Sequence, residues 1–142
     1  MKKGLIPLTV AAILAISISL PGCGPSGDRD EDCAAAYKQA ALKVASVVSA
    51  EFTCGGSFGN SSDRGTVTLA VDTQEEANPA IEEVYRSFAE DPRLTYSSAP
   101  FADFVSESGG ERFDNSDLGF EGSYPTIDEM REKYGITPTP TP

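Results

Sequence analysis

The sequence predicts an α+β domain in which helices pack on one face of a small antiparallel sheet. Three observations predict this class. Residues 34–45 are rich in alanine and hold no helix breaker, residues 48–54 and 66–71 alternate in polarity on either side of a glycine-rich turn, and residues 81–88 carry apolar side chains at helical spacing. The expected order of elements is α-β-β-α-β-(β-β)-α.

The first helix is expected over residues 34–45, because alanine is the strongest helix former, with Asp32 as its N-cap. A strand follows over residues 48–54. Ala50 and Phe52 alternate there with polar residues, as in a strand that is buried on one face.

Residues 55–65 contain four glycines and are expected to form a long turn. A second strand follows over residues 66–71, with Val67, Leu69 and Val71 on its inward face. Strand, turn and strand together predict an antiparallel hairpin.

The second helix has two possible starts. Thr73 and Glu76 match a capping box, whereas Pro79 after Asn78 fits the first turn of a helix better than its interior. With either start, an apolar stripe at i, i+3, i+4 and i+7 is formed by Ile81, Val84, Tyr85 and Phe88. The pair Asp91-Pro92 is expected to end the helix.

The remaining strands are less regular in sequence. Leu94 and Tyr96 predict a third strand, and residues 101–106 and 111–113 are expected to flank a turn at Gly109-Gly110.

A last short helix is expected to begin at the capping box of Thr126 and Glu129 and to end at Gly135. One domain is therefore expected over residues 33–135. The Thr/Pro tail, residues 136–142, is expected to be disordered because it offers almost no apolar side chain to bury.

The N-terminal segment has the features of an export signal. Lys2 and Lys3 precede an apolar run over residues 5–20, which is shorter than a membrane-spanning helix. The run ends in Leu20-Pro21-Gly22-Cys23, which resembles the lipobox of bacterial lipoproteins; Pro21 departs from the small residue usual at its position.

This resemblance implies a diacylglyceryl group on Cys23 and removal of residues 1–22. The protein is then expected at the cell membrane, lipid-anchored on the extracytoplasmic face, because two acyl chains make a lasting anchor. Residues 23–32 are expected to form the lipid anchor and a flexible acidic tether.

Cys33 and Cys54 are expected to form a disulfide, because an even number of cysteines outside the cytoplasm is typical of one. The lengths agree: the first helix rises about 20 Å, and the first strand returns about 20 Å. Cys54 therefore comes back beside the helix start.

Composition excludes several functions. The chain has 22 acids, 11 bases, no histidine and a net charge of −11, which becomes −13 without Lys2 and Lys3; this argues against nucleic-acid binding. No serine- or cysteine-hydrolase motif is present. No enzyme activity, cofactor or metal site is expected, since two cysteines alone do not close a zinc site.

Aromatic residues gather in the poorly periodic segment 96–124. Besides Tyr96 they are Phe101, Phe104, Phe113, Phe120 and Tyr124. They can either complete the core or leave an apolar patch that contacts a partner.

The sequence therefore predicts a non-catalytic binding or accessory module that acts by protein–protein contact, with another envelope protein as partner and the membrane engaged through Cys23. One alternative is a small-ligand or cation-binding lipoprotein that uses the acidic turn 114–121. A carboxylate-based hydrolase is the third.

Overall fold

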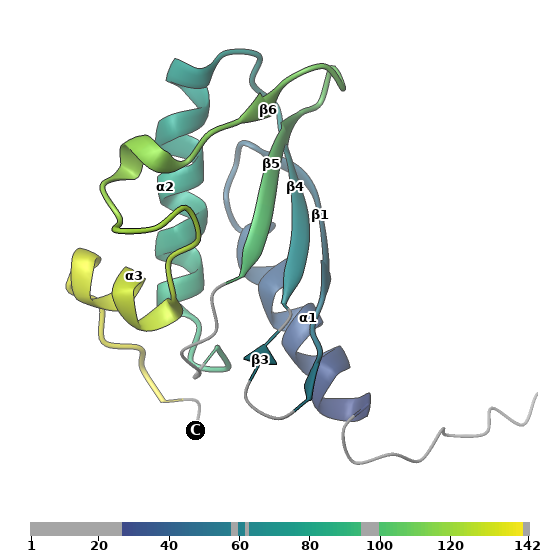
Figure 1. The fold of residues 1–142 in the computed structure, drawn as a ribbon, viewed down its shortest axis with the longest axis vertical. Helices are drawn as coiled ribbons and strands as arrows, with labels where there is room; N and C mark the ends of the chain where they lie inside the picture. The colour runs from purple at the N-terminus through teal and green to yellow at the C-terminus, as the bar shows by residue number, and fades with distance from the viewer. Residues whose placement is uncertain (1–26, 58–59, 62, 95–99, 141–142) are drawn as a thin grey trace, which may run out of the picture.

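The computed structural model describes residues 27–57, 60–61, 63–94 and 100–140. Within them, three α-helices accompany a four-stranded sheet and a separate two-stranded sheet, in the α+β arrangement that the sequence predicts (Figure 1). The expected signal segment, the lipidation site Cys23 and Tyr96 lie outside the described residues.

Helix α1 covers Gly27–Ala41 and so begins earlier than predicted. The predicted N-cap Asp32 lies inside it, and residues 27–32 are helical and not part of a flexible tether. Asp28 and Asp30 lie in its first turn, where carboxylates interact favourably with the helix dipole. One face of this helix is buried, with Ala36 and Ala40 fully inaccessible.

Strands β1 (Val47–Thr53) and β4 (Arg64–Leu69) form the predicted antiparallel hairpin. Ala50 pairs with Val67, and both side chains are buried against the helices. The register shifts between Val47 and Ser49, and Val48 is exposed at this irregularity. The connecting segment holds the short strands β2 (Gly56–Ser57) and β3 (Asn60–Ser61).

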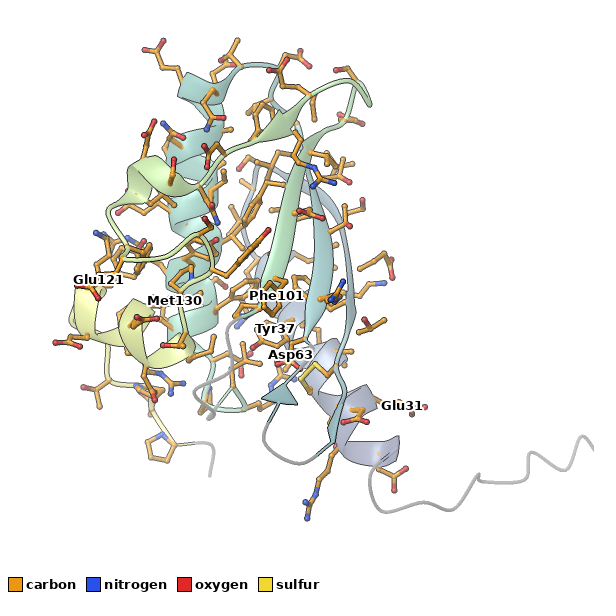
Figure 2. The ribbon with its side chains drawn as sticks, viewed as in Figure 1. Glu31, Tyr37, Asp63, Phe101, Glu121 and Met130 are labelled. Carbon is orange, nitrogen blue, oxygen red and sulfur yellow. A yellow bond between two sulfur atoms is a disulfide. The ribbon has the colours of Figure 1, made fainter. Side chains whose placement is uncertain are left out.

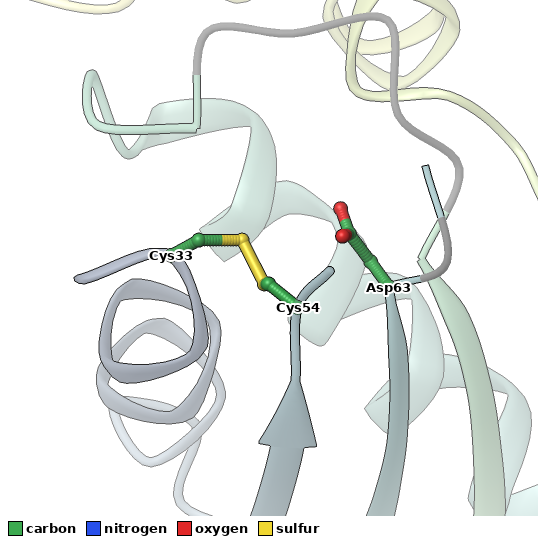
Figure 3. Close-up of side chains that lie close together, drawn as sticks. All are labelled: Cys33, Cys54 and Asp63. Carbon is green, nitrogen blue, oxygen red and sulfur yellow. A yellow bond between two sulfur atoms is a disulfide. The ribbon is translucent and has the colours of Figure 1, made fainter. Parts of the chain in front are cut away.

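The predicted disulfide joins Cys33 of α1 to Cys54, directly after β1, with a Cα–Cα distance of 6.0 Å (Figure 3). It ties the first turns of the described helix to the end of the first strand.

Helix α2 covers Gln74–Glu90 and begins at the first of its two possible starts. The Thr73 side chain accepts a hydrogen bond from the Glu76 backbone N–H, while Pro79 lies inside the helix. Asp91 is its C-cap, as predicted. The apolar stripe of this helix is fully buried.

Strands β5 (Phe101–Ser106) and β6 (Arg112–Phe113) pair antiparallel beyond a turn in which Gly109 has φ 79°. However, β5 pairs parallel with β4, so the expectation of a wholly antiparallel sheet is wrong. The sheet order is β1-β4-β5-β6. Because α2 lies between β4 and β5 in the chain, it supplies the long crossover that a parallel pair requires.

Leu94, predicted to begin a strand, instead lies buried in the turn after α2. The final helix α3 (Ile127–Tyr134) forms as predicted, with a complete Thr126–Glu129 capping box and Gly135 at φ 62°. A 3₁₀ turn, η1 (Ser116–Leu118), precedes it. Helices α1 and α2 lie on one side of the sheet, and α3 packs on α2 (Figure 1).

Candidate functional site

Two of the five aromatic residues proposed for partner contact belong to the core. Phe104 is 1% exposed, with its ring edge-on to that of Tyr85 at a centroid distance of 5.7 Å, and Phe113, which pairs with Phe104 across the sheet, is buried too. Of the two alternatives, completion of the core therefore holds for Phe104 and Phe113. Alternation along β5 turns Phe104 toward the helices.

Phe120 has an intermediate position. Its half-buried ring lies edge-on to the rings of Tyr85 and Tyr134, and the Nζ of Lys133 lies 4.9 Å from its centroid. Burial raises the pKa of Tyr134 to about 12. Phe120 thus fills the space between α2 and α3, and it is not a free contact residue.

Phe101 and Tyr124 are the exposed aromatic residues of the predicted set. Their side chains are 42% and 38% exposed, and their ring centroids are 4.7 Å apart. Figure 2 shows Phe101 near Asp63 where β4 and β5 begin, and the Phe101 backbone N–H donates to the Asp63 carbonyl there. The two rings form a small apolar step on the surface.

The step borders a depression on the side of the sheet opposite the helices, which we call the open face. This depression has a volume of about 480 Å³. Its lining includes Thr53, Arg64, Thr66, Phe101, Asp103 and Tyr124. Sheet register explains this grouping, because Thr53, Arg64 and Phe101 are direct neighbours across β1, β4 and β5.

Charged side chains on the open face are mostly paired. Arg112 binds Asp103 at 3.1 Å, and Lys38 of α1 binds Glu51 of β1 at 2.9 Å. Arg64 differs, because none of the described carboxylates forms an ion pair with it. Its guanidinium carbon lies 5.9 Å from the centroid of the Phe101 ring.

The disulfide brings together three potential metal ligands: the sulfurs of Cys33 and Cys54 and the buried carboxylate of Asp63 lie within 4.8 Å of one another (Figure 3). It is the one such group in the described part of the chain. The two sulfurs are bonded to each other, and a metal ligand must be a thiolate. The oxidised protein therefore does not offer this set to a metal ion.

The acidic turn 114–121 uses the carboxylate of Asp114 locally. The Asp114 carboxylate accepts the Ser116 backbone N–H at 2.8 Å, and this bond lowers the pKa of Asp114. The Gln74 side-chain amide donates a hydrogen bond to the Asp114 backbone carbonyl and accepts one from the Asp114 backbone N–H. This is the geometry of a stabilised turn, and it gives no support to the cation-binding alternative.

Asp91 is a buried acid with a structural role. Its side chain is 2% exposed and receives two hydrogen bonds from the Arg93 guanidinium, at 2.7 and 2.9 Å. The hydrogen bonds from Arg93 lower the pKa of Asp91. A general acid requires the opposite shift. Arg131 donates to three backbone carbonyls nearby and so fixes α3 at the end of α2.

Comparison with known proteins finds no match to a family model, to a curated protein or to a solved structure. In the part of the chain that is described, no helix has both the length and the apolar character needed to cross a bilayer.

Sequence reasoning found Phe101 and Tyr124 but missed Arg64, Asp103 and Arg112. A usable signal was present, since Phe101 and Phe104 are three residues apart and must lie on opposite faces of one strand. The residues that line the depression from β1 and β4 could be assigned only once the strand pairing was known.

Proposed function

We propose that this protein is a lipid-anchored, extracytoplasmic envelope protein that acts as a non-catalytic binding module, with the open face around Phe101 and Tyr124 as its contact surface. The observation that carries the proposal is the exposed pair of contacting rings, tilted by 55° to each other, beside a depression on a sheet face opposite the helices.

The composition of this surface supports contact with a protein. Aromatic residues and arginine are enriched in protein interfaces, and a few such residues carry most of the binding energy. The open face places Phe101, Tyr124 and Arg64 together. Their neighbours are threonines and charged side chains, which are typical of an interface rim.

Anchoring through Cys23 would hold this surface close to the membrane. Helix α1 begins at Gly27, four Cα–Cα steps after Cys23, which span about 15 Å when fully extended. A partner in the same membrane is therefore within reach, whereas a distant one is not.

The anchor is tested by Cys23→Ala. We expect the precursor to remain uncleaved, or the protein to leave the membrane fraction and lose its lipid mass. A processed, lipid-bearing species that stays with membranes would contradict the proposal.

The contact surface is tested by Phe101→Ala and Tyr124→Ala, with Leu42→Ala as control because Leu42 is a similarly exposed apolar residue, at 45%. We expect the first two variants to lose a partner that is crosslinked in intact membranes while their melting temperatures stay near that of the wild type. Equal crosslinking in all three variants would reject the open face as the contact surface.

A small-ligand binder is the second candidate, because a volume of about 480 Å³ falls within the range of ligand sites. A ligand that fills the depression should raise the melting temperature of the wild type and not that of Arg64→Gln.

A further inference from the structure

We infer that the segment docking on the open face is an acidic stretch of protein, in which a carboxylate pairs with Arg64 and a neighbouring apolar side chain packs on Phe101 and Tyr124. This inference rests on the proposed function, because it names the chemistry of the partner for the same surface.

Arg64 is the positive group that the open face leaves available. Of the two arginines that line the depression, Arg112 is bound to Asp103. Arg64 has no ion pair with any described residue and is exposed. A carboxylate from a partner would accept charge-assisted hydrogen bonds from the Arg64 guanidinium.

The position of Arg64 next to Phe101 indicates which side chain of the partner should lie beside its carboxylate. Arg64 pairs with Phe101 across the parallel strands, and the ring of Phe101 contacts that of Tyr124. The guanidinium and the aromatic step therefore lie side by side at one end of the depression. A carboxylate and an apolar side chain only a residue or two apart in the partner can reach both.

The charge on the rest of the surface also favours binding of an acidic segment at the open face. The chain has a net charge of −11, and exposed acids are frequent on the helices, for example Glu75, Glu83, Glu90, Asp128 and Glu132. The lining of the depression instead has two arginines beside two carboxylates. An acidic segment is repelled by the many acids on the helices. At the open face it meets balanced charges and an arginine that no described carboxylate pairs.

An anionic lipid surface is the competing occupant, since it also presents negative charge near the anchor. Binding to it depends on clusters of several basic residues. The open face offers one unpaired arginine in a strongly acidic domain. The observations therefore favour a protein segment.

The test uses the full-length protein, purified in detergent, to select binders from a display library of short random peptides. We expect the enriched peptides to carry Asp or Glu next to an aromatic or aliphatic residue. Arg64→Gln should weaken the best peptide about tenfold, because the charge-assisted pair is lost. Arg86→Gln is the matched control: Arg86 lies on α2, is paired with Glu82, and should leave binding unchanged.

The outcomes separate the two proposals. Peptides that need Phe101 and Tyr124 but carry no acid and ignore Arg64→Gln would overturn the inference and leave the contact surface standing. Peptides that need none of the three residues would reject the contact surface as well. Arg64-dependent binding to vesicles of phosphatidylglycerol, with no acidic peptide enriched, would also overturn the inference in favour of a lipid surface.

Discussion

Alternate residues of β5 meet two different environments. Ala102, Phe104 and Ser106 face the helices and are buried, whereas Phe101, Asp103 and Val105 face away and are exposed or half-buried. The two phenylalanines of this strand are the same residue type three positions apart, yet Phe104 is 1% exposed and Phe101 is 42% exposed. The comparison teaches that aromatic content alone does not mark an interface; the face of the strand decides it.

The inner face should carry the stability of the domain. We expect Phe104→Ala to cost about 3–5 kcal/mol of unfolding free energy, because it removes a fully buried ring that contacts Tyr85. Urea unfolding followed by circular dichroism measures this loss. If Phe104→Ala loses no more unfolding free energy than Phe101→Ala, the two faces of β5 do not differ in their contribution to stability.

Gly65 tests how closely the inner face is packed. A Cβ at this position would lie 2.2 Å from the ring of Phe52, which is stacked against Tyr37 and edge-on to Phe88 and so has little room to move. We expect Gly65→Ala to cost about 1–3 kcal/mol by overpacking.

Gly110→Ala is the matched control for this substitution, since a Cβ there meets no atom within 4 Å. Combining Gly65→Ala with Phe52→Leu should recover part of the loss. A double variant that is simply additive would show that the ring of Phe52 is not the obstacle.

A buried ion pair, Asp91–Arg93, and an exposed one, Asp103–Arg112, should respond differently to acid. Asp91 is buried, and hydrogen bonding to Arg93 holds its pKa below the usual range. Its contribution is therefore present above the unfolded pKa of about 3.9 and is lost as pH falls through the lower folded pKa. Asp91→Asn should flatten the fall in unfolding free energy on the acid side.

Asp103→Asn is the control for the open face, because its pair with Arg112 is exposed and contributes little. At neutral pH, Asp103→Asn should therefore change the unfolding free energy by less than about 1 kcal/mol. For Asp91→Asn the measurement extends into the acid range, and a curve parallel to that of the wild type would contradict the role given to Asp91.

The smallest effect on stability is expected for Phe101→Ala, within about 0.5 kcal/mol, because the ring is largely at the surface. The same substitution should abolish partner contact. A loss of several kcal/mol would show that the ring supports the core, and the open face would then have no aromatic anchor.

Local patterns predicted much of the fold. The Thr73 cap of α2, the capping box at Thr126, the buried stripe of α2 and the turn at Gly109 all depend on residues close together in the chain. All four are present, although at Thr73 only the bond from the Glu76 backbone N–H to the Thr73 side chain completes the cap. The disulfide was predictable because helix and strand lengths limit where Cys33 and Cys54 can meet.

Non-local pairing was not predictable in the same way. The placement of β5 beside β4 depends on where α2 returns the chain, and no short pattern encodes it. The early start of α1 was missed because the glycine and charged residues of its first turn resemble a linker, although the acids there suit a helix N-terminus. The open face follows from these pairings, so only its two aromatic residues could be named from sequence.

The link between Cys33 and Cys54 also determines how the domain bears mechanical load. A force applied at the N-terminal end enters through Gly27 and reaches Cys33 after less than two helical turns. From there it passes through the covalent bond to Cys54, so the intervening chain, which includes the rest of α1 and all of β1, is bypassed. The separation of 21 positions between the two cysteines corresponds to about 70 Å of extended chain, which is not released under tension until the bond is reduced.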